Sequence, residues 1–290
     1  MPMKIYEENG NLILSGVRDF ELLETFDCGQ CFRWDKEDDA YFGVAFGMPL
    51  KIAQKGDVIT LYNTSRDGWD KVWSGYFDME RDYGEIKNRL SQDPVMKTAS
   101  SFGGGIRLLA QEPFECLISF IISASNNIPR IKKIIDSLCT NFGDKVTYLG
   151  KDFYTFPTPE RLASLELSDL AVIKAGFRDK YILNAAKAVA SGQIDLGCLK
   201  SASYEYAKGE LLKLSGVGNK VADCVLLFSL EKYASFPVDV WIKRIMEHCY
   251  FDGETDKETI SLLAYEKFGE LGGFAQQYLF YWARENKIGI

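Results

Sequence analysis

The chain has 290 residues, of which 47% are hydrophobic and 26% are charged, and its formal net charge is −7. These values are typical of a globular protein with one large or two smaller domains, and no apolar run approaches the roughly 20 residues that a membrane span requires. The single histidine, His248, argues against a multi-histidine metal site and against a histidine-dependent catalytic triad.

The cysteines and the first residues of the chain favour a reducing compartment. Residues 1–8 lack the apolar core of a signal peptide, so we expect an intracellular protein, cytoplasmic and nucleoid-associated if its source is prokaryotic. Seven scattered cysteines are an odd number and indicate reduced thiols rather than a disulfide framework. Cys28 and Cys31 form a CxxC motif without a second pair, so we expect no zinc site.

The first third of the chain contains short runs typical of β-strands, separated by turns. Lys55-Gly56 is typical of a hairpin turn, and helical segments are predicted near 69–73 and 83–91. The predicted strands are 11–14, 32–34, 41–46, 50–54 and 58–62. We therefore predict an antiparallel β-rich N-terminal domain over residues 1–103, with covering helices.

Beyond Gly103-Gly104-Gly105, a run typical of a linker, the periodicity is helical to the end of the chain. Pro113 and Pro159 stand where proline is favoured, in the first turn of a helix. A polar break at 123–127 precedes another predicted helix. We predict an all-helical domain over residues 104–290, and an α+β fold overall.

The charges are unevenly distributed between these parts. Residues 1–100 hold 18 acidic and 12 basic residues, whereas residues 126–190 hold 7 acidic and 10 basic residues. Because binding to nucleic acid requires lysine and arginine to neutralise phosphates, any DNA-binding face is expected on the second part, with salt-sensitive binding.

A helix-hairpin-helix is predicted at about 204–230. The helical periodicity of 204–214 stops at Ser215-Gly216-Val217-Gly218, and Asn219 is expected to be the N-cap of a second helix. Glycine permits positive φ and a close approach of a partner to the main chain. The amides of the turn and of the new helix therefore form a predicted anion site that suits a DNA phosphate.

Lys220 and Asp239 are the candidate catalytic pair. Lys220 stands in the first turn of the second helix, where the helix dipole disfavours an ammonium and favours the nucleophilic amine. Asp239 follows nineteen residues later in Pro237-Val238-Asp239-Val240 and can fold back towards it. Each feature alone is more often a plain turn, a solvated lysine or a helix cap, but their combination indicates chemistry on a nucleotide.

The segment LLKLSGVGNKVADC followed by PVDV closely resembles the helix-hairpin-helix-GPD superfamily of DNA glycosylases, in its 8-oxoguanine DNA glycosylase/AP lyase branch. The resemblance implies a bifunctional base excision repair enzyme that removes 8-oxoguanine from duplex DNA. Lys220 would attack C1′ to form a Schiff base, Asp239 would stabilise the developing positive charge, and β-elimination would cut the strand. It also implies an N-terminal domain like that of the TATA-binding protein.

The resemblance implies a monomer that acts on double-stranded DNA containing 8-oxoguanine and needs no cofactor for its chemistry. The four closely spaced cysteines of the iron–sulfur relatives are missing after the hairpin, so no cluster is expected. DNA-phosphate contacts fall on Gly216, Gly218 and Val221. Backbone carbonyls of the hairpin, including Leu214 and Val217, would hold a structural cation.

The base-recognition residues implied by the resemblance come from both halves of the chain. Cys224 and Phe280 would sandwich the base, and Gln276 would read its Watson–Crick edge. Gly29-Gln30-Cys31-Phe32-Arg33-Trp34 matches the family segment whose backbone carbonyl reads N7, which makes Gly29 the lesion reader. Without the resemblance, Cys224 and Phe280 would be interpreted as core residues.

The resemblance also places the contacts to the opposite base. Arg130 and Arg178 occupy the two arginine positions, and Phe177 occupies the position of the aromatic wedge. The chain departs from the family at Ser125, which stands at the place of an asparagine with Asn126 beside it. It departs again at Trp241, where the family often has a phosphate-contacting histidine.

Two other functions remain open from the sequence. One is a helix-hairpin-helix glycosylase for another damaged base, and the other is a non-catalytic DNA-binding protein that uses the hairpin only for phosphate. A substrate panel distinguishes the first, and equal binding of damaged and undamaged duplex would indicate the second. The opposite-base preference, the balance of base removal and strand cleavage, the source and the repair partners do not follow from the sequence.

Overall fold

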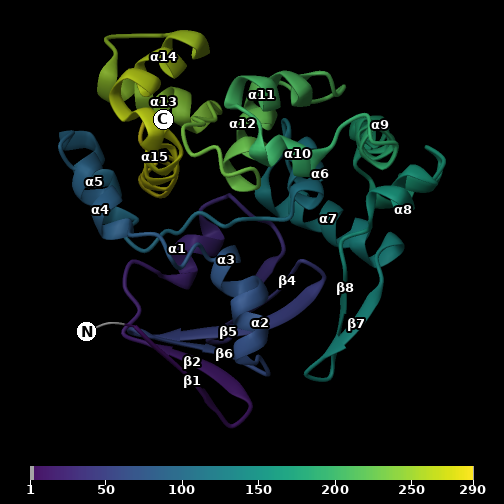
Figure 1. The fold of residues 1–290 in the computed structure, drawn as a ribbon. Coiled ribbons are helices and arrows are strands. Elements are labelled where there is room, and N and C mark those ends of the chain that lie inside the picture. The colour runs from purple at the N-terminus through teal and green to yellow at the C-terminus, as the bar shows by residue number, and fades with distance from the viewer. Residues whose placement is uncertain (1–2, 290) are drawn as a thin grey trace.

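The computed structural model describes residues 3–289 and shows an antiparallel sheet at one end of the molecule and a larger group of helices at the other (Figure 1). The predicted α+β fold is confirmed. Within the described residues, every helix is too short or too polar to span a lipid bilayer.

The sheet has six antiparallel strands in the order β1-β2-β6-β5-β4-β3. Leu61 pairs with both Leu12 and Ile52 in the centre of the sheet, and all three side chains are fully buried. The first strand was not predicted because its residues are largely exposed and mostly polar. The strands are β1 (Lys4–Glu8), β2 (Asn11–Ser15), β3 (Trp34–Glu37), β4 (Ala40–Ala45), β5 (Met48–Lys55) and β6 (Val58–Leu61).

An aromatic core fills the space between the sheet and the short helices that cover it. Phe26 stacks on Trp34 with ring centroids 4.2 Å apart, and Trp73 packs edge-on to the same indole. Buried aromatic side chains contribute most of the apolar area in such a core. The covering elements are α1 (Leu22–Asp27), α2 (Arg66–Gly68), the π-helical turn η1 (Trp69–Trp73) and α3 (Ser74–Tyr76).

The remaining helices share one large hydrophobic core. They are α4 (Tyr83–Leu90), α5 (Pro94–Phe102), α6 (Pro113–Ser123), α7 (Ile128–Phe142), α8 (Pro159–Ala163), α9 (Asp179–Ala190), α10 (Leu196–Ser201), α11 (Tyr204–Leu212), α12 (Asn219–Phe228), α13 (Val240–Tyr250), α14 (Lys257–Phe268) and α15 (Gly272–Asn286). Short 3₁₀ turns η2 (Asp169–Ile173), η3 (Gly176–Arg178) and η4 (Gly269–Leu271) connect some of them.

The prediction of helical structure throughout residues 104–290 was wrong at one place. A hairpin of β7 (Lys145–Tyr148) and β8 (Lys151–Tyr154) interrupts the helices. It extends beside the six-stranded sheet, and the Tyr148 hydroxyl donates to the Tyr62 carbonyl at 2.5 Å while accepting from the Lys51 amide at 3.2 Å (Figure 1). The hairpin forms because its partner is the sheet, which local periodicity does not reveal.

Helices α4 and α5 precede the glycine run but pack on the last helix, α15 (Figure 1). Tyr83 contacts Phe274 edge-on at 5.6 Å, and Phe102 lies 5.6 Å from Tyr281. Residues 83–102 therefore belong to the core of the helical part. The division of the chain at residues 103 and 104 remains a prediction.

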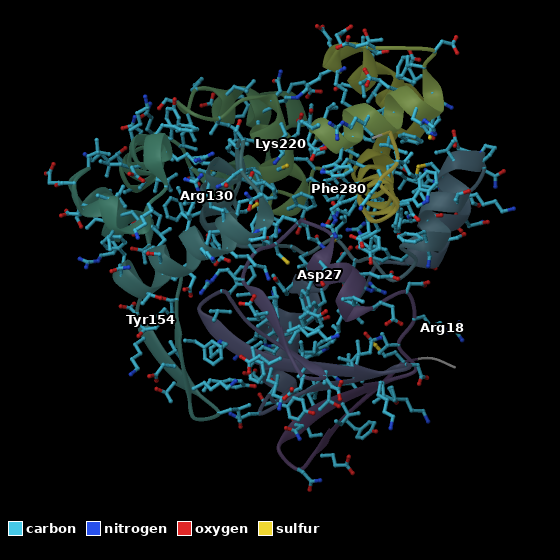
Figure 2. All side chains as sticks on the ribbon, turned by 180° about the vertical axis from the view of Figure 1, so that it is seen from behind. Arg18, Asp27, Arg130, Tyr154, Lys220 and Phe280 are labelled. Atoms are coloured by element: carbon cyan, nitrogen blue, oxygen red, sulfur yellow. The ribbon has the colours of Figure 1, made fainter. Side chains whose placement is uncertain are left out.

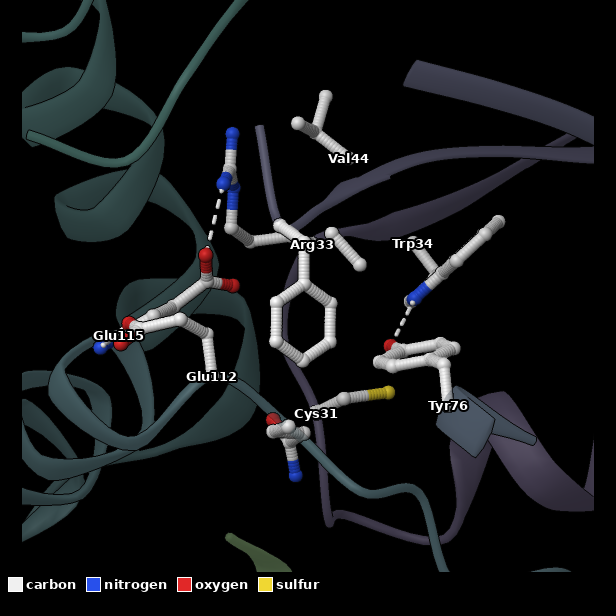
Figure 3. A pocket seen from close by; sticks show the side chains of 10 residues that line it. Cys31, Arg33, Trp34, Val44, Tyr76, Glu112 and Glu115 are labelled. Carbon is white, nitrogen blue, oxygen red and sulfur yellow. Dashed lines mark hydrogen bonds and ion pairs between the residues drawn. The ribbon is translucent and has the colours of Figure 1, made fainter. Parts of the chain in front are cut away.

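A buried ion pair joins the segment that follows α1 to the helical part. Arg33 lies 3.0 Å from Glu115 on α6, with side-chain exposures of 10% and 13% (Figure 3). It also donates to the carbonyl of Tyr154. Burial raises the pKa of the Glu115 carboxyl, and Arg33 opposes that shift. The adjoining cavity of about 10 Å³ is large enough for one water molecule at most. This corner of the structure therefore positions the 28–33 loop and does not bind a ligand.

Replacing Arg33 with Met should lower the free energy of unfolding by about 3 kcal/mol, because it leaves the Glu115 carboxylate buried without a counter-charge. Removing both charges in Arg33→Met/Glu115→Leu should restore most of the loss. Urea denaturation measures both effects. Arg66→Met, in the half-exposed pair with Asp70, is the control and should lower the free energy of unfolding far less, because solvent screens that pair. An equal loss in the two single variants would contradict the structural role of Arg33.

Candidate functional site

A cleft of about 730 Å³ lies between the 28–33 loop, the α6–α7 turn, the hairpin before α12, the loop before α13, and α15. Lys220 and Phe280, both labelled in Figure 2, reach it from α12 and α15. The cleft brings together most of the residues singled out from the sequence: Gly29, Ser125, Asn126, Gly216, Gly218, Lys220, Val221, Cys224, Asp239, Gln276 and Phe280. Arg130, Phe177, Arg178, Leu214 and Val217 are not among its lining residues.

The helix-hairpin-helix has the predicted geometry, with α11 and α12 joined by a tight turn. Gly216 has φ +87°, and a Cβ there would lie 2.4 Å from Cγ of Tyr181, so only glycine fits. The prediction that Asn219 is the N-cap was wrong, because Gly218 occupies that position without a side-chain cap. The first amides of α12 consequently remain available to an anion.

Lys220 is half-buried, and its amine is held on one side of the cleft. Nζ donates to Oγ of Ser123 at 3.2 Å and lies 4.9 Å from the centre of the Phe120 ring. Ser123 and Phe120 both belong to α6, which packs against α12. The lysine is therefore anchored by a neutral acceptor and an aromatic face, and the described residues contain no ion pair between Lys220 and Asp239.

Asp239 caps α13, as predicted, by accepting the amide of Ile242 at 2.8 Å. Burial raises the pKa of its carboxyl, while the Ile242 amide and the charge of Lys220 oppose the rise. The fold thus holds a carboxylate in a partly desolvated position beside an amine. Such a group can stabilise a positive charge that develops between them.

Cys224 and Gln276 contribute a buried thiol and a buried side-chain amide to the cleft. Burial raises the pKa of the Cys224 thiol to about 12, although the nearby Lys220 opposes the rise. Gln276 is 5% exposed, and its Oε1 lacks a hydrogen-bond partner among the described residues. Because a buried acceptor without a partner is costly, Oε1 of Gln276 indicates a place where a ligand donor is expected.

The loop at Gly29 is held in place by the last helix. Gly29 has φ +80°, and a Cβ there would lie 2.9 Å from Cε1 of Phe280. Gln277 donates from Nε2 to the carbonyl of Cys28 at 2.5 Å, and Arg284 donates to the carbonyl of Asp27. The main chain at Gly29 therefore contacts the ring of Phe280 at the wall of the cleft. A larger residue at position 29 would separate the two.

Arg178 is more buried than the other residues that were predicted to contact the opposite base. It is only 3% exposed, and its guanidinium donates to the carbonyls of Ala124, Ser125 and Ala175. Burial, with the charge of Arg130, lowers its pKa. In this conformation Arg178 holds the α6–α7 turn.

The neighbours of Arg178 are more accessible. Phe177 is 59% exposed and lies 4.3 Å beneath the Arg178 guanidinium, so an apolar ring projects from the surface. Ser125, with φ +51°, and Arg130 are exposed. Asn126 donates to the Ile122 carbonyl at 3.1 Å, and Trp241 is half-buried at the cleft.

Sequence reasoning missed four residues that shape the site: Phe120, Ser123, Gln277 and Arg284. Ser123 was noted only as part of a polar break, and the other three lie in ordinary helical patterns. Their roles depend on the packing of distant elements, so no local signal identifies them. For metals, the described residues contain no group of three or more His, Cys, Asp or Glu side chains that could hold an ion.

Comparison with known proteins covers both parts of the chain. Residues 12–117 match the family model described as 8-oxoguanine DNA glycosylase, N-terminal domain. Residues 118–268 match that of the HhH-GPD superfamily base excision DNA repair protein. The Methanothermobacter thermautotrophicus probable N-glycosylase/DNA lyase is 34% identical over an alignment that covers 94% of this chain and 96% of its own.

Solved structures extend the comparison. The Clostridium acetobutylicum 8-oxoguanine glycosylase/lyase, in complex with double-stranded DNA containing cytosine opposite 8-oxoG, is 45% identical, with a TM-score of 0.96 and coverage of 99% of this chain and 100% of its own. A 3-methyladenine DNA glycosylase from Archaeoglobus fulgidus, at 22% identity, covers 92% of this chain and 93% of its own with a TM-score of 0.73, which shows a shared fold alone.

Replacing Gly29 with Ala should lower the free energy of unfolding by about 2 kcal/mol or more, because it combines backbone strain with displacement of the Phe280 ring. Gly10→Ala is the matched control, since Gly10 has φ +77° and open space around its Cβ position. The control should cost only about 1 kcal/mol. Urea denaturation compares the two, and equal costs would show that the Phe280 contact contributes nothing.

Replacing Asp239 with Asn should raise the free energy of unfolding at pH 7 by about 1 kcal/mol. Burial raises the pKa of Asp239 in the folded state, so its contribution to stability is present below the ordinary aspartate value of 3.8 and is lost as the pH rises through the folded value. Asparagine keeps the helix cap without the charge.

Urea denaturation at pH 7 and pH 3 tests the predicted direction of this change in the free energy of unfolding. The gain in Asp239→Asn should be present at pH 7 and absent at pH 3, where the aspartate is protonated. A variant that is less stable than the unmodified protein at pH 7 would show that the carboxylate is not strained.

Proposed function

The chain belongs to the 8-oxoguanine DNA glycosylase family, whose members are N-glycosylase/DNA lyases of base excision repair, and we propose that Lys220 is the nucleophile of this reaction. The observation that carries the proposal is the convergence of Lys220 and Asp239 in one cleft with Gly29, Cys224, Gln276 and Phe280. These residues come from four separate places in the chain, and a plain turn or a solvated lysine would not require that convergence.

The chemistry follows from the positions of the amine and the carboxylate. The lone pair of Lys220 Nζ forms a bond to C1′ of the damaged nucleoside as the bond from C1′ to the base breaks. Asp239, partly desolvated and close enough to interact with Lys220, stabilises the positive charge that develops on the sugar. Loss of a proton and opening of the sugar then give a Schiff base, from which β-elimination cuts the strand.

Recognition of the base uses groups with vacant hydrogen-bonding capacity. Oε1 of Gln276 is a buried acceptor without a partner, and the Watson–Crick edge of 8-oxoguanine offers N–H donors to it. The carbonyl of Gly29 would accept the N7–H of 8-oxoguanine and repel the N7 lone pair of guanine. Phe280 and Cys224 would lie against the two faces of the base, in a cleft that both line.

The DNA backbone would be bound at the hairpin. The amides of Gly216, Gly218 and Val221 would form the phosphate site, and the carbonyls of Leu214 and Val217 would hold a structural cation. The Leu214 carbonyl accepts the Val217 amide at 3.1 Å, which leaves its second lone pair for such an ion. The ion would help to bridge the hairpin to phosphate.

The exposed ring of Phe177 is suited to fill the space that the extruded nucleotide leaves, with Arg130, Ser125 and Asn126 beside the opposite base. Arg178 would support this surface through the 124–125 carbonyls that it binds. We infer that the enzyme acts on double-stranded DNA containing 8-oxoguanine as a monomer, in the compartment that holds the DNA.

Borohydride reduction in the presence of duplex containing 8-oxoguanine tests the role of Lys220. The unmodified protein should be trapped covalently on the DNA. Lys220→Gln should remove trapping and slow base excision by on the order of a thousandfold, because the nucleophile is lost. Lys213→Gln is the control, since Lys213 is an exposed lysine next to the same hairpin and pairs with Glu210. Undiminished trapping in Lys220→Gln would refute the assignment.

A further inference from the structure

Ser123 holds the amine of Lys220, and we infer that it is a positioning residue for the attack on C1′. Its Oγ accepts an N–H from Lys220 Nζ at 3.2 Å, and its side chain lines the same cleft. This inference rests on the proposed role of Lys220 as the nucleophile. No other hydrogen bond from Lys220 Nζ to an oxygen is present among the described residues.

The hydroxyl of Ser123 can act towards the amine only as an acceptor. Its single proton is donated to the carbonyl of Phe120, three residues earlier on α6, at 2.8 Å. The lone pairs that remain face Lys220. Because the hydroxyl has no second proton, it does not donate to the neutral amine, and the nitrogen lone pair stays free for the sugar.

The contact between Ser123 and Lys220 becomes stronger as the reaction proceeds. When the Nζ lone pair forms the bond to C1′, the electron pair of the bond between C1′ and the base leaves with the base, and the nitrogen becomes positively charged. The nitrogen then loses one proton, and the departing base gains one. An acceptor on the remaining N–H stabilises the charged nitrogen more than the neutral amine, so it lowers the barrier.

The acceptor is rigid because it lies at the end of a packed helix. Ser123 is the last residue of α6, whose Phe120 stacks on Phe228 of α12 with ring centroids 5.5 Å apart and an angle of 15° between the planes. The same Phe120 ring lies 4.9 Å from Lys220 Nζ, where a developing positive charge is favoured. Helix packing therefore fixes the hydroxyl and the aromatic ring that lie beside the amine.

Single-turnover excision of 8-oxoguanine from saturating duplex tests the role of Ser123. Ser123→Ala should slow excision about tenfold, the effect of losing one hydrogen bond to a charged group. Its affinity for the duplex and its midpoint of thermal unfolding should stay unchanged. Ser123→Thr retains the hydroxyl and should recover the rate, whereas Ser123→Cys, with a weak acceptor of similar size, should resemble the alanine variant.

Ser91→Ala is the matched control, because Ser91 donates to the carbonyl of Asn88 at 2.8 Å in the same i to i−3 geometry and, among the described residues, accepts no hydrogen bond from a lysine amine. It should excise at the unmodified rate. An unchanged rate in Ser123→Ala and Ser123→Cys, or a threonine variant as slow as alanine, would overturn the inference. Failure of the unmodified protein to be trapped by borohydride would instead refute the proposed nucleophile, so the two failures are distinguishable.

Discussion

The packing of α12 against α6 determines where the amine of Lys220 lies. Phe120 stacks on Phe228 between these helices, and the two helices bring Lys220 to within hydrogen-bond distance of Ser123. On its other side, α12 pairs with α11, where Lys208 and Tyr204 bind the buried carboxylate of Asp223. The helix that carries Lys220 is thus fixed on two faces, and the first amides of this helix are left without a side-chain cap.

Around this rigid helix, the cleft retains groups whose folded environment is unfavourable without substrate. Burial raises the pKa of Asp239, Oε1 of Gln276 lacks a partner, and Gly29 adopts a positive φ against the ring of Phe280. The folded protein would be more stable if the Asp239 carboxylate were replaced by a neutral group, if Oε1 of Gln276 were solvated, or if the backbone at Gly29 could relax. Local instability of this kind is found at sites where binding energy is used for recognition or catalysis.

The parts of the site that were predictable from the sequence are those with a local signature. In the turn before Lys220, Gly216 adopts a positive φ that favours glycine, and Asp239 caps its helix within three residues. The Gly29 segment lies far from both in the chain and was recognised only by resemblance to a known family. Its position against Phe280 depends on how α15 closes over the loop, a contact that no periodicity predicts.

The sequence also left out features that exist only between distant elements. The β7–β8 hairpin is stabilised by contact with the sheet, where Tyr148 binds Tyr62 and Lys51 beside the interior strands β6 and β5, so the local pattern gave no reason to expect strands there. Ser123 and Arg178 were part of a polar break and of a predicted DNA surface, respectively. In the folded chain Ser123 accepts a hydrogen bond from the Lys220 amine, and Arg178 donates to three carbonyls. The role of a side chain depends on which unsatisfied groups the fold places near it.

The negative net charge of the chain does not prevent binding to DNA, because the charges near the cleft differ from the total. Many acidic side chains of the sheet and of its covering helices are paired within the protein, as Asp35 is with Lys132 and Glu37 with Lys151. Lys257 lines the cleft, and Arg130 is exposed at the start of α7. Since salt screens charges beyond about 10 Å, the phosphates near the cleft respond to these local cations more than to acidic groups at the far end of the sheet.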